Sequence, residues 1–130
     1  MMDPILVSDV MERCVHTIHC QQSVAEAEDI LSSNRISGAP MVASDGQIMG
    51  VVSNTDIIRF HHESRHADPE AQMVYEIGTP IVVTVDEQAT LREAAGLMAK
   101  REIHRLVVVR GGIPVGILTS LDVTRLFAET

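Results

Sequence analysis

A short motif that could bind an anion occurs twice in this chain. It is Gly50-Val51-Val52-Ser53-Asn54-Thr55-Asp56 in the first half and Gly116-Ile117-Leu118-Thr119-Ser120-Leu121-Asp122 in the second. Each copy reads as an apolar strand that runs into a helix, with a hydroxyl and an aspartate three residues apart in the first turn. A helix N-terminus presents unpaired N–H groups to a phosphate, and an aspartate beside it can accept hydrogen bonds from a sugar diol. The motif therefore predicts nucleotide binding.

The same residues also have a purely structural interpretation. Ser53 with Asp56, and Thr119 with Asp122, fit a capping box. In that arrangement the hydroxyl accepts an N–H of the first helical turn, and the acid accepts the N–H of the cap residue. The motif alone leaves both interpretations open.

The motif belongs to a longer internal repeat. Ser23 corresponds to Thr90 at an offset of 67, and Gly50 corresponds to Gly116 at an offset of 66, so one residue is missing from a turn of the second copy. A repeat of this length indicates two copies of one supersecondary unit, each too small to bury its apolar face well alone. We expect residues 1–66 to form the first copy, with an N-terminal helix and the start of the linker, and residues 67–130 to form the second.

Hydrophobic periodicity and turn residues predict the order strand, helix, strand, strand, helix in each copy. The first copy opens with a short helix after Ser8 or Asp9, and residues 61–69 read as the linker. Ser23 and Thr90 open capping boxes of the long helices. The remaining expected elements are an extended piece at 14–18, hairpin strands at 41–43 and 47–53 around Asp45-Gly46, a helix from Thr55 to about His62, hairpin strands at 106–109 and 113–119 around Gly111-Gly112, and a helix at 120–128.

Composition limits the classes of partner. With 130 residues, of which 45% are hydrophobic, the chain can form a compact soluble domain, and its net charge of -8 makes nucleic acid and anionic membranes poor partners. The start of the chain lacks a signal-peptide pattern and no apolar run has the length of a membrane span, so we expect a cytoplasmic protein. Cys14 and Cys20 are too few for a disulfide framework.

Two groups of possible metal ligands are weak candidates. Cys14, His16, His19 and Cys20 lie within seven residues, but strand alternation turns His19 away from the others, and zinc sites usually use two separated ligand pairs. A second group, His61, His62 and His66, lies in the linker. We expect no metal site and, because no nucleophile with a base is visible, no enzyme activity.

Three motifs of the chain resemble those of a known family. Ile36-Ser37-Gly38-Ala39-Pro40 leads the first hairpin, His104-Arg105 stands at the matching place in the second, and the Gly-x-x-Ser/Thr-x-x-Asp motif closes both. This pattern, from Val7 to Phe127, resembles a pair of CBS domains (cystathionine-β-synthase type), also called a Bateman module. The resemblance implies a mixed α/β fold in which two β-α-β-β-α repeats, related by a pseudo-twofold axis, pack through their sheets.

The resemblance also implies adenosine-containing ligands (AMP, ADP, ATP or S-adenosylmethionine) in two clefts between the repeats. Asp56 and Asp122 match the aspartates that hold the ribose hydroxyls. Arg59 and Arg125 follow them by three residues and could reach phosphate or solvent, and Arg105 with His104 is expected at phosphate. The other matching positions are Ser53, Thr55 and Thr119 near phosphate, Thr17 and Thr84 near adenine, and Ala39, Pro40, Leu106 and Val107 along the wall that faces the base.

We therefore expect a stand-alone regulatory module that senses an adenine nucleotide, needs no further cofactor and regulates an unidentified protein partner. We also expect a homodimer, because similar modules stack through the apolar faces of their helices. The alternatives are a dimerisation or scaffolding module with no physiological nucleotide, and a module that binds S-adenosylmethionine.

Overall fold

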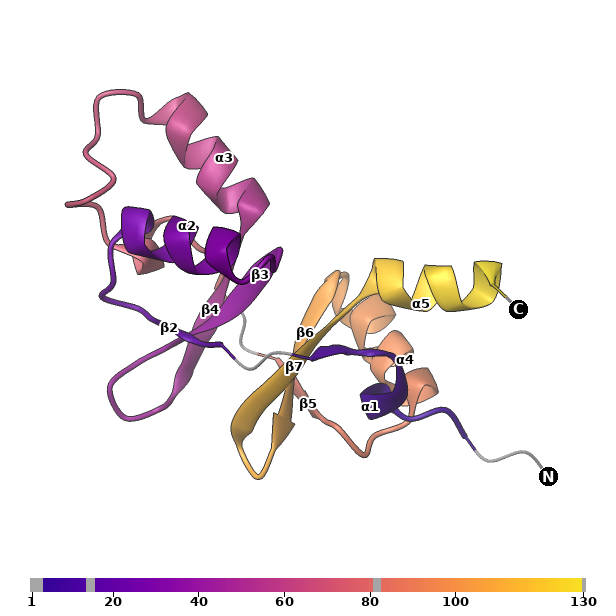
Figure 1. The fold of residues 1–130 in the computed structure, drawn as a ribbon. Helices are drawn as coiled ribbons and strands as arrows, with labels where there is room; N and C mark the ends of the chain where they lie inside the picture. Colours follow the sequence, from indigo (N-terminus) through magenta and orange to yellow (C-terminus); the bar gives the residue numbers. More distant parts are fainter. Residues whose placement is uncertain (1–3, 14–15, 81–82, 130) are drawn as a thin grey trace. The chain divides into compact units, whose positions relative to one another are not determined.

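A computed structural model describes residues 4–13, 16–80 and 83–129 of the chain (Figure 1). These residues form two compact units. We call residues 16–80 the first-repeat unit, and residues 4–13 together with 83–129 the second-repeat unit.

The first-repeat unit contains a three-stranded sheet of order β2-β3-β4. β2 and β3 are parallel because α2 connects them, whereas β3 and β4 form an antiparallel hairpin. Gly46 in the hairpin turn has a φ of 86°, which confirms the turn expected at Asp45-Gly46. The elements are β2 (Ile18–His19), α2 (Val24–Ser33), β3 (Gly38–Val42), β4 (Ile48–Ser53), α3 (Asn54–Glu63) and the 3-10 helix η1 (Val74–Glu76).

The second-repeat unit contains a four-stranded sheet of order β1-β7-β6-β5. Its elements are α1 (Val7–Val10), β1 (Glu12–Arg13), β5 (Thr84–Asp86), α4 (Leu91–Arg101), β6 (Arg105–Arg110), β7 (Ile113–Thr119) and α5 (Ser120–Ala128). From β2 and from β5 onward, both units follow the order strand, helix, strand, strand, helix, which confirms the predicted fold class. No helix in the described ranges is both long and apolar enough to span a bilayer, the longest being α4 with 11 residues.

The long helices form where the caps and the apolar periodicity predict them. The hydroxyls of Ser23 and Thr90 each accept the backbone N–H three residues later, from Glu26 and Glu93, at 3.1 Å. One face of each helix is buried: Val24, Ala27 and Leu31 in α2, and Leu91, Ala94 and Met98 in α4. Burial of each large aliphatic side chain stabilises its unit by about 1.5 to 3 kcal/mol.

Two short segments belong to units that their sequence positions do not suggest. β1, in the first half of the chain, pairs antiparallel with β7, and the N–H of Val7 donates to Ala89 O at 2.8 Å. In the first-repeat unit, Thr79 exchanges two backbone hydrogen bonds with Val51, at 2.8 and 2.9 Å. We call β1, which precedes β2, and the residues around Thr79, which precede β5, the lead-in segments. Each lead-in segment pairs with the second hairpin strand of the other repeat: β1 with β7, and Thr79 with β4. The compact units therefore differ from the halves 1–66 and 67–130, and that division of the repeat stays a prediction.

Smaller differences concern element ends. The N-terminal helix begins at Val7 rather than after Ser8. Leu6 is its cap residue, and the Leu6 N–H donates a hydrogen bond to Asp9 Oδ2 at 2.9 Å. Of the extended piece expected at 14–18, residues 14 and 15 lie outside the described residues, and among residues 16–18 only Ile18 belongs to a strand, β2. The helix expected from Thr55 begins one residue earlier.

Glycine is required where the lead-in segments cross the hairpins. A Cβ atom at Gly50 would overlap Thr79 O, and one at Gly116 would lie 2.6 Å from Met11 Sδ and 2.8 Å from Glu12 O. Both distances at Gly116 are shorter than van der Waals contact, and the two oxygens are backbone atoms that cannot move aside easily. The glycine that opens each copy of the motif is therefore needed for this close approach.

A buried carboxylate holds three segments of the second-repeat unit together. The backbone of Glu87 donates to Val109 O and accepts from Ser8 N, both at 3.0 Å. Its side chain is 8% exposed and receives two hydrogen bonds from the guanidinium of Arg110, the Nη2–Oε1 distance being 3.0 Å. The Arg110 hydrogen bond holds the pKa of Glu87 below its ordinary value of 4.5; burial opposes this, and the charges of Arg110 and Arg13 add to it.

This depressed pKa predicts a pH-dependent contribution to stability. Below pH 4.5 the unfolded chain binds a proton at Glu87 before the folded chain does, so the stabilisation is present above that pH and is lost as the pH falls through the folded-state pKa. Arg110→Met should therefore lower the urea midpoint at neutral pH, and the difference from wild type should shrink in acid. Arg65→Met, at an exposed arginine of the linker, is the matched control. A difference that is constant with pH would contradict this assignment.

Candidate functional site

Both copies of the motif form the strand-to-helix junction that the sequence predicts. At the start of α3, the N–H of Asp56 donates to Ser53 Oγ at 3.3 Å, and Asp56 Oδ2 accepts the N–H of Ser53 at 2.9 Å. At the start of α5, the corresponding distances between Asp122 and Thr119 are 3.1 and 2.9 Å. The capping-box interpretation is thus confirmed in both copies. A ligand could use only the carboxylate lone pairs that the box leaves free.

The carboxylate of Asp56 has further donors from its own unit. Its Oδ1 accepts from Arg59 Nη1 at 3.3 Å and from Thr79 Oγ1 at 3.2 Å, and its Oδ2 also accepts the Ser53 hydroxyl at 3.1 Å. Asp56 is 3% exposed. Arg59, which we expected at phosphate or in solvent, is thus ion-paired with the aspartate.

Sequence reasoning did not identify Thr79 as a neighbour of this site. The residue lies 23 positions after Asp56, between η1 and β5. The available signal was Gly50, because a glycine inside an apolar strand indicates a close backbone approach, and Thr79 is the residue that approaches.

Asp122 has a more open environment. It is only half-buried, and within the described ranges no side chain donates to its Oδ1. Arg125, three residues later, is exposed and makes no ion pair with Asp122. The Oδ1 atom of this aspartate is therefore available to an external donor.

Arg105 lies next to this open junction. It is the first residue of β6 and pairs with Thr119, the cap of α5. Among the described residues its guanidinium has no ion-pair partner, although it is partly buried. Gly38 occupies the corresponding place opposite Ser53 in the first-repeat unit, so the strand residue paired with the cap carries a charge in the second-repeat unit but not in the first.

His104 is exposed and lies at the base of α5. Its carbonyl accepts the N–H of Ser120 at 2.9 Å, and its Nδ1 is 3.5 Å from the hydroxyl of that residue. The side chain also lines a shallow groove between α4 and α5. Its expected support of Arg105 at a phosphate stays a prediction.

The remaining expected site residues fall into an apolar and a polar set. Ala39 and Pro40 of β3, and Leu106 and Val107 of β6, are buried strand residues. The three threonines are exposed: Thr17 just before β2, Thr84 opposite Val107 in β5, and Thr55 in the first turn of α3. These residues belong to the same units as the two copies of the motif, and their contact with a ligand stays a prediction.

The histidines and cysteines do not assemble into a metal centre within the ranges that the structure describes. His19 Nε2 lies 3.0 Å from Ser44 Oγ, and its Nδ1 accepts the N–H of Gln21. His61 forms an ion pair with Glu28 at 2.7 Å when protonated.

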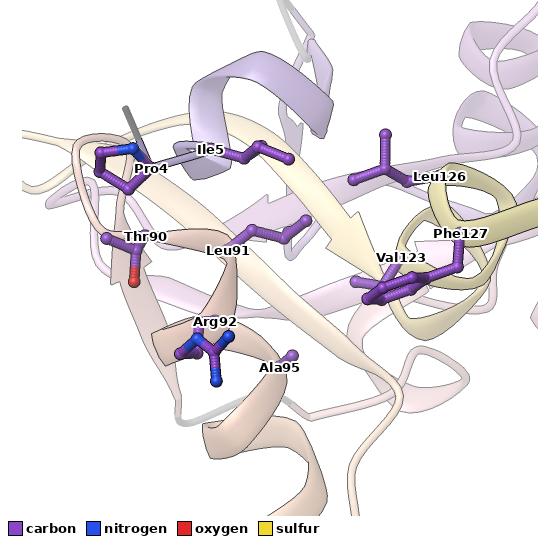
Figure 2. Close-up of a pocket in the computed structure, with 9 residues that line it drawn as sticks. All are labelled: Pro4, Ile5, Thr90, Leu91, Arg92, Ala95, Val123, Leu126 and Phe127. Carbon is purple, nitrogen blue, oxygen red and sulfur yellow. The ribbon is translucent and has the colours of Figure 1, made fainter. Parts of the chain in front are cut away.

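An apolar groove lies between α4 and α5 of the second-repeat unit (Figure 2). It has a volume of about 460 Å³, and Figure 2 shows Leu91 and Ala95 on one side with Val123 and Phe127 on the other. Ile5 and Pro4 close one end. Since α5 has no fully buried residue, this helix exposes most of its apolar side chains.

Solved structures of the same fold include proteins with bound adenosine derivatives. The CBS domain pair of protein MJ0100, in complex with 5′-methylthioadenosine and S-adenosyl-L-methionine, superposes with a TM-score of 0.77 at 30% identity over 98% of both chains. CBSX2 in complex with AMP superposes with a TM-score of 0.69 at 27% identity over 96% of this chain and 97% of that one.

Sequence relatives are longer proteins. The L-aspartate semialdehyde sulfurtransferase of Methanocaldococcus jannaschii is 32% identical over 129 residues, which are 98% of this chain and 24% of that protein. The homoserine O-acetyltransferase of Methanohalobium evestigatum is 31% identical over 124 residues, 95% of this chain and again 24% of the relative. The chain thus spans about a quarter of the length of these two relatives.

The repeat detected in the sequence corresponds to two matches of one family. The CBS domain profile matches residues 7–63 and residues 74–129, and these ranges contain both strand-to-helix junctions. The chain therefore belongs to the CBS domain family and contains a pair of CBS repeats.

Proposed function

We propose that this chain is a regulatory module that binds an adenine nucleotide (AMP, ADP or ATP) at the duplicated strand-to-helix junction. The observation that carries the proposal is the junction of the second-repeat unit. There Asp122 has a free Oδ1, and Arg105 lies beside the cap of α5 without an ion-pair partner among the described residues. The ribose diol would donate to Asp122, and the phosphate would accept from Arg105.

Support comes from the adenosine derivatives bound to CBS pairs of the same fold. In this proposal the base lies along the backbone of Leu106 and Val107 in β6. S-adenosylmethionine is a second candidate, because the similar pair of protein MJ0100 binds it. Arg105 favours the nucleotide, since S-adenosylmethionine has no phosphate to accept the guanidinium donors.

A regulatory role follows from the absence of a catalytic set in the site residues and from the use of one junction twice. Ligand binding would change the surface shown to a partner. The free energy available for this change equals the difference in binding free energy of the ligand between the two states. The partner would be another protein or a further domain of the kind that the longer relatives contain.

Calorimetry tests ligand binding directly. AMP, ADP, ATP and S-adenosylmethionine are titrated at up to millimolar concentration, and Asp122→Ala should weaken the ligand that binds by about 1.5 to 3 kcal/mol, the range for a hydrogen bond to a charged group. Asp9→Ala is the matched control, because Asp9 caps α1 of the same unit with its carboxylate but lies outside the motif. If none of the four ligands releases or absorbs heat, the proposed function is wrong.

A comparison of nucleotide with nucleoside tests the role of Arg105. Arg105→Ala should weaken AMP by about 1.5 to 3 kcal/mol and leave adenosine nearly unchanged, because only AMP has a phosphate to accept the guanidinium hydrogen bonds. Arg101→Ala, at an exposed arginine of α4, should change neither affinity. An equal loss for both ligands would show that Arg105 only shapes the site.

We also propose that the module is a homodimer through its helical faces. Phe127 is 74% exposed and Leu121 is 53% exposed, and both lie on α5. Phe127 lines the apolar groove of Figure 2, whereas Leu121 lies in the first turn of the helix. An exposed apolar surface of this kind is typical of an interface.

Light scattering should therefore give the mass of a dimer at high micromolar concentration. Phe127→Asp should shift the mass toward a monomer, because burial of a carboxylate at the interface is unfavourable. The control Ile113→Asp changes a residue at the start of β7 that is 67% exposed, and it should leave the dimer intact. A monomer mass for the wild-type protein would rule out this assembly.

A further inference from the structure

The two aspartates of the duplicated motif differ in how many hydrogen bonds they already accept. An ionised carboxylate offers about four lone-pair positions. Asp56 receives four hydrogen bonds, from the Ser53 N–H, the Ser53 hydroxyl, Arg59 and Thr79. Asp122 receives one, from the Thr119 N–H, within the described ranges. Asp56 therefore has no unused acceptor position, whereas Asp122 has three.

The difference comes from the segments that cross the two hairpins. Thr79 crosses at Val51, and Glu12 occupies the corresponding place opposite Ile117 in the second-repeat unit. A threonine hydroxyl can donate to a carboxylate, whereas an ionised glutamate cannot. The arginine that follows each aspartate by three residues adds to this difference. Arg59 forms an ion pair with Asp56, whereas Arg125 forms none with Asp122.

The number of free acceptor positions on each carboxylate determines how a ligand with a vicinal diol can bind there. Two ribose hydroxyls can donate to Oδ1 of Asp122 without displacing a protein group. At Asp56 the same hydroxyls must first replace Thr79 or Arg59, and the displaced hydroxyl must find another acceptor or water. Since Thr79 is exposed, its side chain can rotate toward solvent without disturbing the core.

We propose that Thr79, supported by Arg59, occupies the diol-binding position of Asp56 in the free protein and makes the two sites unequal. The Asp122 site fills first, and the Asp56 site accepts a ribonucleoside only after Thr79 turns away. Thr79 is thus a specificity-determining residue of the first site. This inference rests on the proposed function, because it assumes that the diol binds the aspartates.

The experiment isolates each site by removing the other aspartate. In an Asp122→Ala background, calorimetry with adenosine measures the Asp56 site, and Thr79→Val should tighten binding by about tenfold, the lower end of the range for a hydrogen bond to a charged group. Valine keeps the shape and the β-branch of threonine and removes only the donor. In an Asp56→Ala background the same substitution should leave adenosine affinity unchanged.

Three controls define the mechanism. Thr124→Val removes a hydroxyl that bonds only the backbone of α5, so it should not change the Asp56 site. With 2′,3′-dideoxyadenosine as the ligand, the gain from Thr79→Val should disappear because no diol is present. Arg59→Met removes the second donor and should also tighten adenosine binding, which keeps the test available if Thr79→Val fails to fold.

The outcomes separate this inference from the proposed function. If wild-type protein binds no adenosine ligand, the proposed function fails. If it binds, but Thr79→Val weakens adenosine at the Asp56 site or leaves it unchanged, Thr79 is a ligand contact or a bystander and the inference is overturned. An equal gain with the dideoxy compound would also overturn it, because Thr79 would then act by bulk rather than through the carboxylate.

Discussion

The close crossing of a lead-in segment over the outer strand of each hairpin is the constraint on which the two units depend. It requires glycine at Gly50 and Gly116, because a Cβ atom at either position would overlap a backbone oxygen. Once the crossing is made, backbone hydrogen bonds join Thr79 to Val51, and β1 to β7. The crossing also determines which side chain arrives beside each aspartate.

Each aspartate of the motif serves folding before it can serve binding. It caps the helix that carries it and accepts the N–H of the last strand residue, so hydrogen bonds within the chain already form the strand-to-helix junction. A preformed junction suits a binding site, since little conformational entropy is lost when a ligand binds. The two interpretations that the sequence left open are therefore compatible rather than exclusive.

Duplication gave two junctions with the same backbone and different side chains around them. The first-repeat unit has Thr79 and Arg59 on its aspartate and Gly38 opposite its cap. The second-repeat unit leaves Asp122 more open and places Arg105 opposite its cap. A phosphate bound to this acidic chain, of net charge -8, would have to be held by such short-range donors, because the long-range field of the chain repels anions.

The element order, the helix caps, the buried faces of α2 and α4 and the duplicated motif were all predictable from the sequence, because these features depend on local spacing and on residues three or four apart. The sequence also indicated the family through the order of motifs. The pairing of each lead-in segment with its hairpin is visible only in the folded structure. Because of this pairing, the Thr79 hydroxyl donates to Asp56, whereas Glu12 takes the corresponding place in the other unit. These contacts join residues far apart in the chain, whose meeting depends on strand pairing that periodicity does not encode.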